Sequence, residues 1–345
     1  MAQSNTVNRR WLLASRPHGA PVLDNFKYET VPIPEPADGE LLLRTIYLSL
    51  DPYMRGRMNA AESYAAPLQI GDVIVGGTVS VVVKSNHPNY AVGDTVVGYL
   101  GWQDYAISNG KFMEKLKGPI LNHQSLALGA LGMPGLTAYF GLIDIGNPKP
   151  GETVVVSAAT GAVGSLVGQI AKIKGCYVVG IAGGPEKCRY AVETLGFDKC
   201  IDHKDDNMAQ LLKEACPKGI DVYFENVGGK VFNAVLDLVN TGARIPICGL
   251  ISVYNATSYP VGPDRISAYN GKILSKRMRV QGFISTMDYG HRYKEFADAM
   301  GQWVFEGKIT YREDVTDGLE NAPQTLIGLL EGKNFGKVII KVADK

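Results

Sequence analysis

Cysteine is scarce in this sequence and is confined to its middle. The five cysteines are Cys176, Cys188, Cys200, Cys216 and Cys248. Their odd number, their wide spacing and the lack of any Cys-x-x-Cys pair argue against a disulfide framework and against a structural zinc site. A reducing compartment, the cytoplasm, is therefore the expected location.

Long apolar runs and blocks of like charge are also missing. No apolar run in the sequence approaches the roughly 18 residues of a membrane-spanning helix. Lysine and arginine total 35 against 34 for aspartate and glutamate, a formal net charge of +1. Because nucleic acids and anionic membranes attract basic patches, the sequence predicts neither as a partner.

What the sequence does contain is enough apolar material for a large core. With 345 residues, 46% of them hydrophobic, the chain is expected to form about two domains.

Residues 153–175 predict a strand, a tight turn and a helix. The β-branched run at 153–156 is followed by Ala159-x-Gly161-x-x-Gly164, a dinucleotide fingerprint with alanine in place of its first glycine. Small residues there let the backbone of Gly161, Ala162, Val163 and Gly164 approach a pyrophosphate at the helix N-terminus. A degenerate motif of this kind also fits a turn that binds nothing, so the neighbouring elements decide.

Those neighbours alternate between strands and helices. Apolar strands are expected at 177–182, 199–202, 220–225, 243–248 and 278–284, with helices at 187–195, 208–215 and 230–239. Such alternation predicts an α/β fold with a doubly wound parallel sheet, which binds ligands at the carboxyl ends of its strands.

The flanking segments have a different character. Short extended stretches separated by Pro/Gly-rich turns precede residue 133, and short strands around one helix return after residue 308. We therefore predict a β-rich domain formed by residues 1–133 and 308–345, interrupted by a nucleotide-binding domain at 134–307.

The nicotinamide cofactor can be argued from charge. An NAD enzyme usually places a carboxylate at the tip of the second strand, but here the tip is uncharged, Ala182-Gly183-Gly184. Lys187 follows, and a cation there would pair with a 2′-phosphate, so NADPH is the expected cofactor. The alternative makes Glu186 the ribose ligand and Lys187 an ordinary surface residue.

Six stretches together carry a family resemblance. The chain resembles the medium-chain dehydrogenase/reductase superfamily, in the zinc-independent branch of leukotriene 12-hydroxydehydrogenases, prostaglandin reductases and plant double-bond reductases. The stretches are residues 50–58 (LDPYMRGRM), 133–139 (MPGLTAY), 158–164 (AATGAVG), 225–229 (ENVGG), 248–255 (CGLISVYN) and 332–337 (GKNFGK). Residues 8–19 and 290–337 are most similar to the bacterial curcumin reductases of that branch.

The resemblance implies a fold, a cofactor and a set of binding residues. The fold is a Rossmann domain inserted into a GroES-like domain, the cofactor is NADPH, and the assembly is a homodimer. Lys187 is implied to bind the 2′-phosphate, near His203, which stands where many relatives carry tyrosine. The other implied cofactor contacts are Asn226, Cys248, Gly249, Leu250, Ile251, Ser252, Tyr254, Phe283, Ile284, Ser285 and Asn334. Asn226 can instead cap the following helix or shape the Gly228-Gly229 turn.

The expected reaction follows from the missing metal ligands. Zinc-dependent alcohol dehydrogenases use cysteine and histidine ligands, but no cysteine precedes Cys176, and His18, His87 and His123 stand alone. An enone accepts hydride at its β carbon and needs only its enolate oxygen stabilised. The family resemblance implies the same reaction, on enones and enals including curcumin-like diarylenones.

Tyr254 is the leading candidate for the acid that assists this reaction. A phenol stays protonated at neutral pH and can donate to an enolate, although the ring can also merely pack against the nicotinamide. Tyr53, Tyr64, Met133 and Tyr139 are the candidate substrate contacts, since an aromatic and methionine-lined pocket suits a flat conjugated substrate. For each tyrosine of the β-rich domain, packing is an equal alternative.

Two rival functions stay open at this point. One is an NADPH:quinone oxidoreductase of the same superfamily, and the other is a non-catalytic NADPH-binding protein. Activity with quinones alone, or cofactor binding without turnover, distinguishes them.

Overall fold

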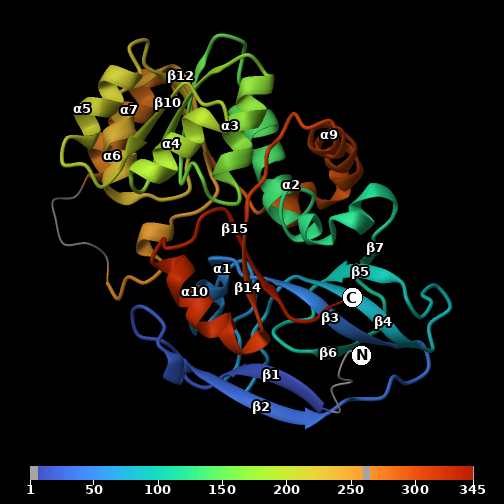
Figure 1. The fold of residues 1–345 in the computed structure, drawn as a ribbon. Helices are drawn as coiled ribbons and strands as arrows, with labels where there is room; N and C mark the ends of the chain where they lie inside the picture. The colour runs from blue at the N-terminus through green and yellow to red at the C-terminus, as the bar shows by residue number, and fades with distance from the viewer. Residues whose placement is uncertain (1–6, 259–264, 345) are drawn as a thin grey trace. The chain divides into compact units, whose positions relative to one another are not determined.

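The computed structural model describes residues 7–258 and 265–344, which fold into two units (Figure 1). The first unit comprises Met1–Leu128 and Glu313–Lys345, and the second Gly129–Arg312. The sequence places the boundaries at 133/134 and 307/308 instead. The flanking residues belong to the second unit because Tyr311 packs against Gly129, while the backbone of Thr310 exchanges two hydrogen bonds with the Gln169 side chain, at 2.7 and 2.8 Å.

The second unit is built on a six-stranded parallel sheet. Its strand order is β10-β9-β8-β11-β12-β13, so the chain runs outward in one direction from β8 and then in the other from β11. This confirms the predicted doubly wound sheet. The strands are β8 (Thr153–Ser157), β9 (Tyr177–Ala182), β10 (Lys199–Asp202), β11 (Ile220–Phe224), β12 (Val239–Ile247) and β13 (Arg279–Gly282).

The central strands of this sheet are apolar runs because both of their faces are covered. All five residues of β8 are buried, and Val155, Val179, Tyr223 and Ile245 belong to one core cluster. The helices of the unit are α2 (Met133–Phe140), α3 (Gly164–Ile173), α4 (Pro185–Glu193), α5 (Met208–Ala215), α6 (Gly229–Leu236), α7 (Ile266–Lys276), α8 (Ser285–Tyr289) and α9 (Tyr293–Phe305).

The first unit is β-rich, as predicted. A seven-stranded sheet has the order β14-β15-β3-β4-β5-β7, with β6 paired to β3, and β1 and β2 form a separate antiparallel pair. The strands are β1 (Val7–Leu13), β2 (Phe26–Pro32), β3 (Leu41–Ser49), β4 (Thr78–Ser85), β5 (Thr95–Gly98), β6 (Tyr105–Ser108), β7 (Glu114–Lys115), β14 (Glu313–Asp317) and β15 (Lys337–Lys341). Two helices, α1 (Tyr53–Arg57) and α10 (Ala322–Leu330), complete it.

The returning tail is integral to this first unit. β15 pairs with β3 antiparallel, and Ile340 of β15 shares a core cluster with Leu13, Leu48 and Trp102. The chain is therefore a β-rich unit interrupted by an α/β unit, which confirms the predicted fold class.

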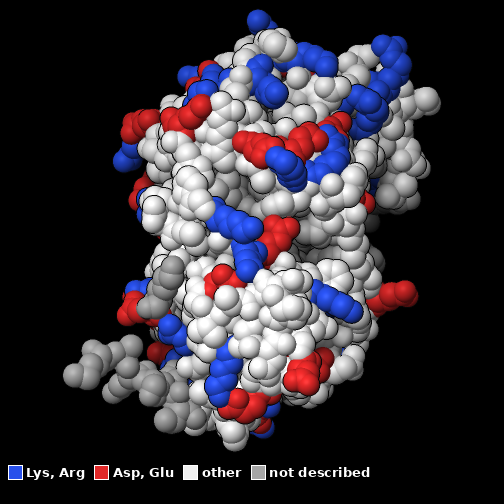
Figure 2. Space-filling view, turned by 90° about the vertical axis from the view of Figure 1, so that its right-hand side faces the viewer, with Lys and Arg blue, Asp and Glu red and all other residues white. Residues whose placement is uncertain are grey.

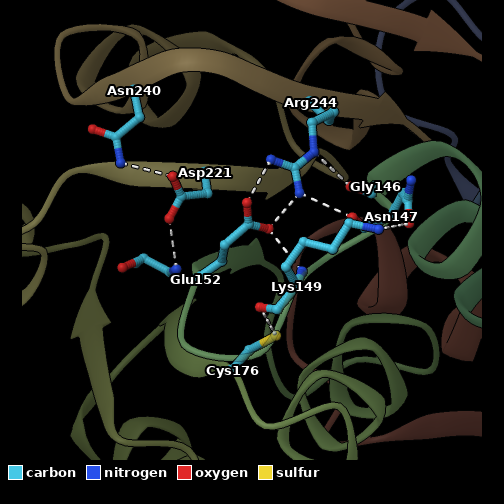
Figure 3. Close-up of polar contacts among 9 residues, drawn as sticks. Gly146, Asn147, Lys149, Glu152, Cys176, Asp221, Asn240 and Arg244 are labelled. Atoms are coloured by element: carbon cyan, nitrogen blue, oxygen red, sulfur yellow. Dashed lines mark hydrogen bonds and ion pairs between the residues drawn. The ribbon is translucent and has the colours of Figure 1, made fainter.

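Charged side chains join the amino ends of the strands in the second unit (Figure 3). Arg244 of β12 forms an ion pair with Glu152, directly before β8, and donates to the backbone oxygens of Gly146 and Asn147 at 2.8 and 3.0 Å. Asp221 of β11 accepts a hydrogen bond from the backbone N–H of Thr153 at 2.8 Å. These contacts join β8, β11 and β12 at the end opposite to the carboxyl ends of the strands.

The surface carries both charge signs. Figure 2 shows basic and acidic side chains interspersed over the face that it draws, with no large region of one sign. Within residues 7–258 and 265–344, no helix combines the length and the apolar character needed to cross a bilayer.

Candidate nucleotide-binding and catalytic site

The candidate site begins where the strand order reverses. β8 and β11 are neighbours at the centre of the sheet, and their connections leave in opposite directions. In doubly wound sheets, the carboxyl ends of the strands at such a switch point are where ligands bind. Ser157 ends β8, and Glu225 follows β11 directly.

The turn after β8 has the close approach that a pyrophosphate site requires. Ala158 adopts a left-handed conformation with φ 51°, and the N–H of Gly161 donates to the Ala158 oxygen at 2.9 Å. A Cβ on Gly164 would lie 2.3 Å from that same oxygen, so only glycine fits there. Gly161, Ala162 and Val163 thus lead tightly into the N-terminus of α3, where backbone N–H groups favour an anion.

Glu225 organises the next loop, a role that the sequence reasoning missed. Its side chain is 1% exposed, and Oε1 accepts hydrogen bonds from the Tyr223 hydroxyl at 2.9 Å and from the N–H groups of Val227 and Gly228 at 2.6 and 2.9 Å. Among the described residues, Oε2 is buried without a hydrogen-bond partner. A carboxylate directly after an apolar strand was the available signal, because a buried charge requires a function or a partner.

Asn226 is held on the neighbouring strand. Its backbone N–H donates to the Ser157 hydroxyl at 2.9 Å, and its side-chain nitrogen donates to the backbone carbonyl oxygen of Ser157 at 2.8 Å. The positive φ angles of Gly228 and Gly229, 79° and 58°, then turn the chain into α6. The side chain of Asn226 therefore lies at the switch point, as the sequence predicts, and it also helps to shape this loop.

The loop after β12 folds onto the same segment. The N–H groups of Cys248 and Gly249 donate to the backbone carbonyl oxygen of Glu225 at 2.9 and 3.2 Å, and that of Ile251 donates to the backbone carbonyl oxygen of Asn226 at 3.1 Å. Ser252 donates from both its N–H and its hydroxyl to the oxygen of Val227. The predicted cofactor contacts of residues 248–252 are thus brought beside Asn226 by backbone hydrogen bonds.

Tyr254 lies over its own loop. Its hydroxyl oxygen accepts a hydrogen bond from the N–H of Leu250 at 3.3 Å and would lie 3.0 Å from a Cβ on Gly249. This contact fixes the phenol beside residues 248–250, at the carboxyl end of β12.

The carboxyl ends of β9 and β10 form the expected phosphate end of the site. Asp202 accepts hydrogen bonds from the N–H groups of Gly184 and Lys204, both at 2.9 Å. Burial acts to raise the pKa of Asp202, but these hydrogen bonds outweigh it and lower that pKa. The carboxylate thereby fixes Gly184, which precedes α4, and Lys187 lies in the first turn of that helix.

His203 is close to this turn. Its Nε2 would lie 2.9 Å from a Cβ on Gly183, so the imidazole occupies the space beside that glycine. Burial lowers the pKa of His203, and the nearby Lys230 and Lys204 lower it further against the effect of Asp202. A lowered pKa favours the neutral imidazole at pH 7, which donates one hydrogen bond from one ring nitrogen and accepts one at the other.

The predicted residues after β13 are tied to α2 within the second unit. The hydroxyls of Ser285 and Thr137 are 2.7 Å apart, and Thr137 donates to the oxygen of Met133 at 2.8 Å. Phe283 packs edge-on against Phe224 of β11, with ring centroids 6.3 Å apart. Ile284, between Phe283 and Ser285 in the sequence, directly precedes α8.

Tyr139 lies deeper in the second unit. Its ring packs against Phe140, Phe296 and Trp303, with centroids 5.0, 6.1 and 6.1 Å away, and the residue is buried. Burial, followed by the nearby Glu295 carboxylate, raises its pKa. The structure thus shows Tyr139 as part of an aromatic cluster within the second unit.

In the first unit, tyrosines gather around Asp51. Burial raises the pKa of Tyr53 well above 10, and the Asp51 carboxylate and the hydroxyls of Tyr99 and Tyr64 raise it further. The pKa values of Tyr64 and Tyr99 are also raised by partial burial, although the two residues are 48% and 59% exposed. Tyr53 and Tyr64 are thus brought together, and Tyr99 is a third member that the sequence did not single out.

A buried lysine holds the loop that carries Tyr53. Lys337, 1% exposed, donates to the oxygens of Leu50 and Val338, both at 2.8 Å, and lies 3.2 Å from Asp51 Oδ1. Burial lowers its pKa, against the effect of Asp51. Asn334 closes the turn before β15, with its side-chain nitrogen donating to the Gly336 oxygen at 2.9 Å.

In the part of the chain that the structure describes, no three His, Cys, Asp or Glu side chains are grouped as metal ligands.

The chain matches two family models and several known proteins. The family model described as "N-terminal domain of oxidoreductase" matches residues 9–116, and the one described as "Zinc-binding dehydrogenase" matches residues 162–302. The chain is 64% identical over 343 residues to an NADPH-dependent curcumin reductase of Escherichia coli, covering 99% of each chain. It is 45% identical to bovine prostaglandin reductase 1 over 337 residues, covering 96% of this chain and 98% of that one.

A solved structure matches over the full length. The CurA protein of Vibrio vulnificus, crystallised in complex with NADPH, superposes with a TM-score of 0.95 at 61% sequence identity. The match covers 98% of this chain and 100% of that one.

Proposed function

Because the chain belongs to the medium-chain dehydrogenase/reductase superfamily, in the branch of prostaglandin and curcumin reductases, we propose that it is an NADPH-dependent enone reductase. It reduces the carbon–carbon double bond of α,β-unsaturated ketones and aldehydes, curcumin-like diarylenones among them. The observation that carries this proposal is the 64% identity to a curcumin reductase over 99% of both chains.

The residues at the carboxyl ends of the sheet suit NADPH. Gly161, Ala162, Val163 and Gly164 offer backbone N–H groups to the pyrophosphate, and the lack of room for a side chain at Gly164 supports this assignment. Lys187 and His203 hold the 2′-phosphate. Asn226, residues 248–252, Tyr254 and Phe283, Ile284 and Ser285 hold the ribose and nicotinamide. Asn334 is proposed as a further cofactor contact because the family resemblance implies it.

The chemistry requires little from the protein beyond orientation and one proton. Bound NADPH supplies a hydride, which forms the new C–H bond at the β carbon of the enone. The π electrons move to the carbonyl oxygen as an enolate, and a proton adds at the α carbon. Tyr254 donates a hydrogen bond to the enolate oxygen or passes the proton, and the N–H of Leu250 stabilises the phenol oxygen as it gains charge.

The substrate contacts are proposed separately for each unit. Tyr53 and Tyr64 contribute aromatic rings and protonated hydroxyls, since their pKa values are raised. Met133 and Tyr139 contribute apolar surface. Aromatic and thioether groups suit a flat conjugated ligand with few charges.

A substrate panel tests the proposed function. NADPH and NADH are each assayed with acyclic enones, quinones and alcohols, with and without a chelator. We expect NADPH oxidation with the enones, and no effect of the chelator. Turnover of quinones without acyclic enones would establish the quinone oxidoreductase, and NADPH binding without any turnover would establish a non-catalytic binding protein.

The assembly is proposed to be a cytoplasmic homodimer. β13 ends the strand order of the six-stranded sheet and pairs only with β12 among the described strands, so its outer edge is open to a second copy. Light scattering on the purified protein checks the dimer, which a monomeric mass would exclude.

A further inference from the structure

Two cysteines of the second unit lie against each other. Cys188 of α4 and Cys200 of β10 have their thiols in hydrogen-bonding contact. Cys200 pairs in register with Gly180 of β9, where a Cβ would lie 3.2 Å from its sulfur, so this glycine leaves room for the thiol. Cys176, Cys216 and Cys248 lie on other segments, before β9, after α5 and after β12.

The two thiols have different environments. The pKa of Cys188 is lowered because the Cys200 thiol and the backbone of Ala182 donate hydrogen bonds to its sulfur, against the effect of burial. Cys188 also lies near the N-terminus of α4, where the helix dipole favours a thiolate. The pKa of Cys200 is raised by the contact with Cys188 and by burial. Cys188 is thus the nucleophile of the pair, and Cys200 is the resolving thiol.

The helix that carries Cys188 is lightly anchored. Ala191 is the one fully buried residue of α4, and the rest of the helix is half-buried or exposed. A disulfide requires the two sulfurs to approach to about 2 Å, so α4 has to move toward β10. A helix with few buried contacts makes that displacement at low cost.

We propose that Cys188 and Cys200 form a reversible disulfide that draws the first turn of α4 toward β10 and thereby weakens NADPH binding. Lys187 is adjacent to Cys188, and Gly184, which opens α4, is held by Asp202 two residues after Cys200. A shift of this turn displaces the lysine from the 2′-phosphate. The effect on the cofactor rests on the proposed function, whereas the disulfide itself does not.

The oxidant is a peroxide, and the step balances. The Cys188 thiolate attacks one peroxide oxygen, the O–O bond breaks, and a sulfenic acid forms with release of water after protonation. The Cys200 sulfur then displaces the hydroxyl of the sulfenic acid, which leaves as a second water. Two thiols lose two electrons and two protons, and one hydrogen peroxide is reduced to two waters.

The experiment uses the full-length reduced protein treated with stoichiometric hydrogen peroxide. Remaining thiols are alkylated in denaturant, and the digested peptides are analysed by mass spectrometry. We expect a Cys188–Cys200 cross-link, with Cys176, Cys216 and Cys248 still alkylated. Complete alkylation of Cys188 and Cys200, or a cross-link elsewhere, would overturn the proposal.

A second readout measures the coupling between the disulfide and NADPH binding. NADPH fluorescence titration of the peroxide-free oxidised protein should give a Kd raised about fivefold or more, the lower range of coupling between linked sites, and dithiothreitol should restore it. By reciprocity, saturating NADP+ should disfavour the disulfide in a glutathione buffer by the factor by which the disulfide raises the Kd of NADP+, measured in the same way. An unchanged Kd in fully cross-linked protein would refute the coupling.

Variants separate the two cysteines. Cys200→Ser should leave a Cys188 sulfenic acid that dimedone traps and no cross-link, and Cys188→Ser should leave neither. Cys216→Ala is the matched control and should cross-link like the parent protein. These readouts need no substrate turnover, so a failure of enone reduction leaves them intact and distinguishes the two proposals.

Discussion

At the scale of the residue, the chemistry depends on a few side chains whose positions are set by their neighbours. Tyr254 is held by the N–H of Leu250, and Asn226 by Ser157. Glu225 presents one oxygen to the whole loop that contains Asn226. The residues of the sequence motif are thus arranged by backbone contacts that the motif itself does not reveal.

Replacing Tyr254 tests the acid. With Tyr254→Phe we expect kcat on a good acyclic enone to fall about 100-fold, the scale of general acid catalysis, with little change in the KM for NADPH. Tyr269→Phe, a ring that packs against Phe232, is the matched control and should leave kcat unchanged. Unaltered turnover in Tyr254→Phe would remove the proton-donor role and leave a packing role.

Replacing Lys187 tests cofactor choice. Lys187→Met should raise the KM for NADPH about tenfold to 100-fold, the worth of a charge-assisted hydrogen bond, and leave the KM for NADH unchanged. Lys199→Met, an exposed lysine of β10, serves as the control. An unchanged KM for NADPH would favour the alternative in which Glu186 binds the ribose and Lys187 is an ordinary surface residue.

At the scale of the element, the apolar strands were the most predictable. β9 and β10 match their sequence-based bounds because each is an apolar run flanked by turn residues. β2 was not predicted, since only Phe26 of its seven residues is buried and its sequence ends in proline. The role of Glu225 in its loop, and the place of Tyr99 among the tyrosines near Asp51, depend on contacts between distant segments. No local sequence pattern encodes such contacts.

The buried side chain of Lys337 joins strand β15 to the segment around Asp51. Lys337→Met should lower the free energy of unfolding by about 3–5 kcal/mol, because Asp51 keeps a buried charge without its partner. Urea titration followed by the fluorescence of Trp11 and Trp102, both in the first unit, measures this. A double variant with Asp51→Asn should recover part of the loss. A loss below about 1 kcal/mol, the value of an exposed pair, would contradict the structure.

The ion pair between Glu152, directly before β8, and Arg244 of β12 predicts that the stability of the protein depends on pH. Burial acts to raise the pKa of Glu152, but Arg244 and the N–H of Lys149 lower it below its ordinary value of 4.5. A lowered folded-state pKa contributes stability that is complete above pH 4.5 and is lost as the pH falls through the folded-state value. Glu152→Gln should therefore lower the thermal midpoint at pH 7 and lose less stability on acidification than the parent. Glu193→Gln, an exposed control, should behave as the parent protein does in thermal unfolding at each pH.

At the scale of the whole molecule, one unit interrupts the other. The sheet of the first unit is complete only when β15 returns from the end of the chain to pair with β3. The sequence predicts this insertion because the tail again shows short strands after residue 308, and the two compact units bear it out. The family resemblance supplies the reaction, which neither the periodicity nor the charge of the sequence specifies.

The most direct measurement follows the hydride itself. NADPH carrying deuterium at the reactive C4 position is incubated with the protein and an acyclic diarylenone, and the product is analysed by NMR. The account predicts one deuterium at the β carbon, a solvent-derived hydrogen at the α carbon, and an intact carbonyl. Deuterium on the carbinol carbon of an alcohol product, or an unlabelled enone after prolonged incubation, would contradict it.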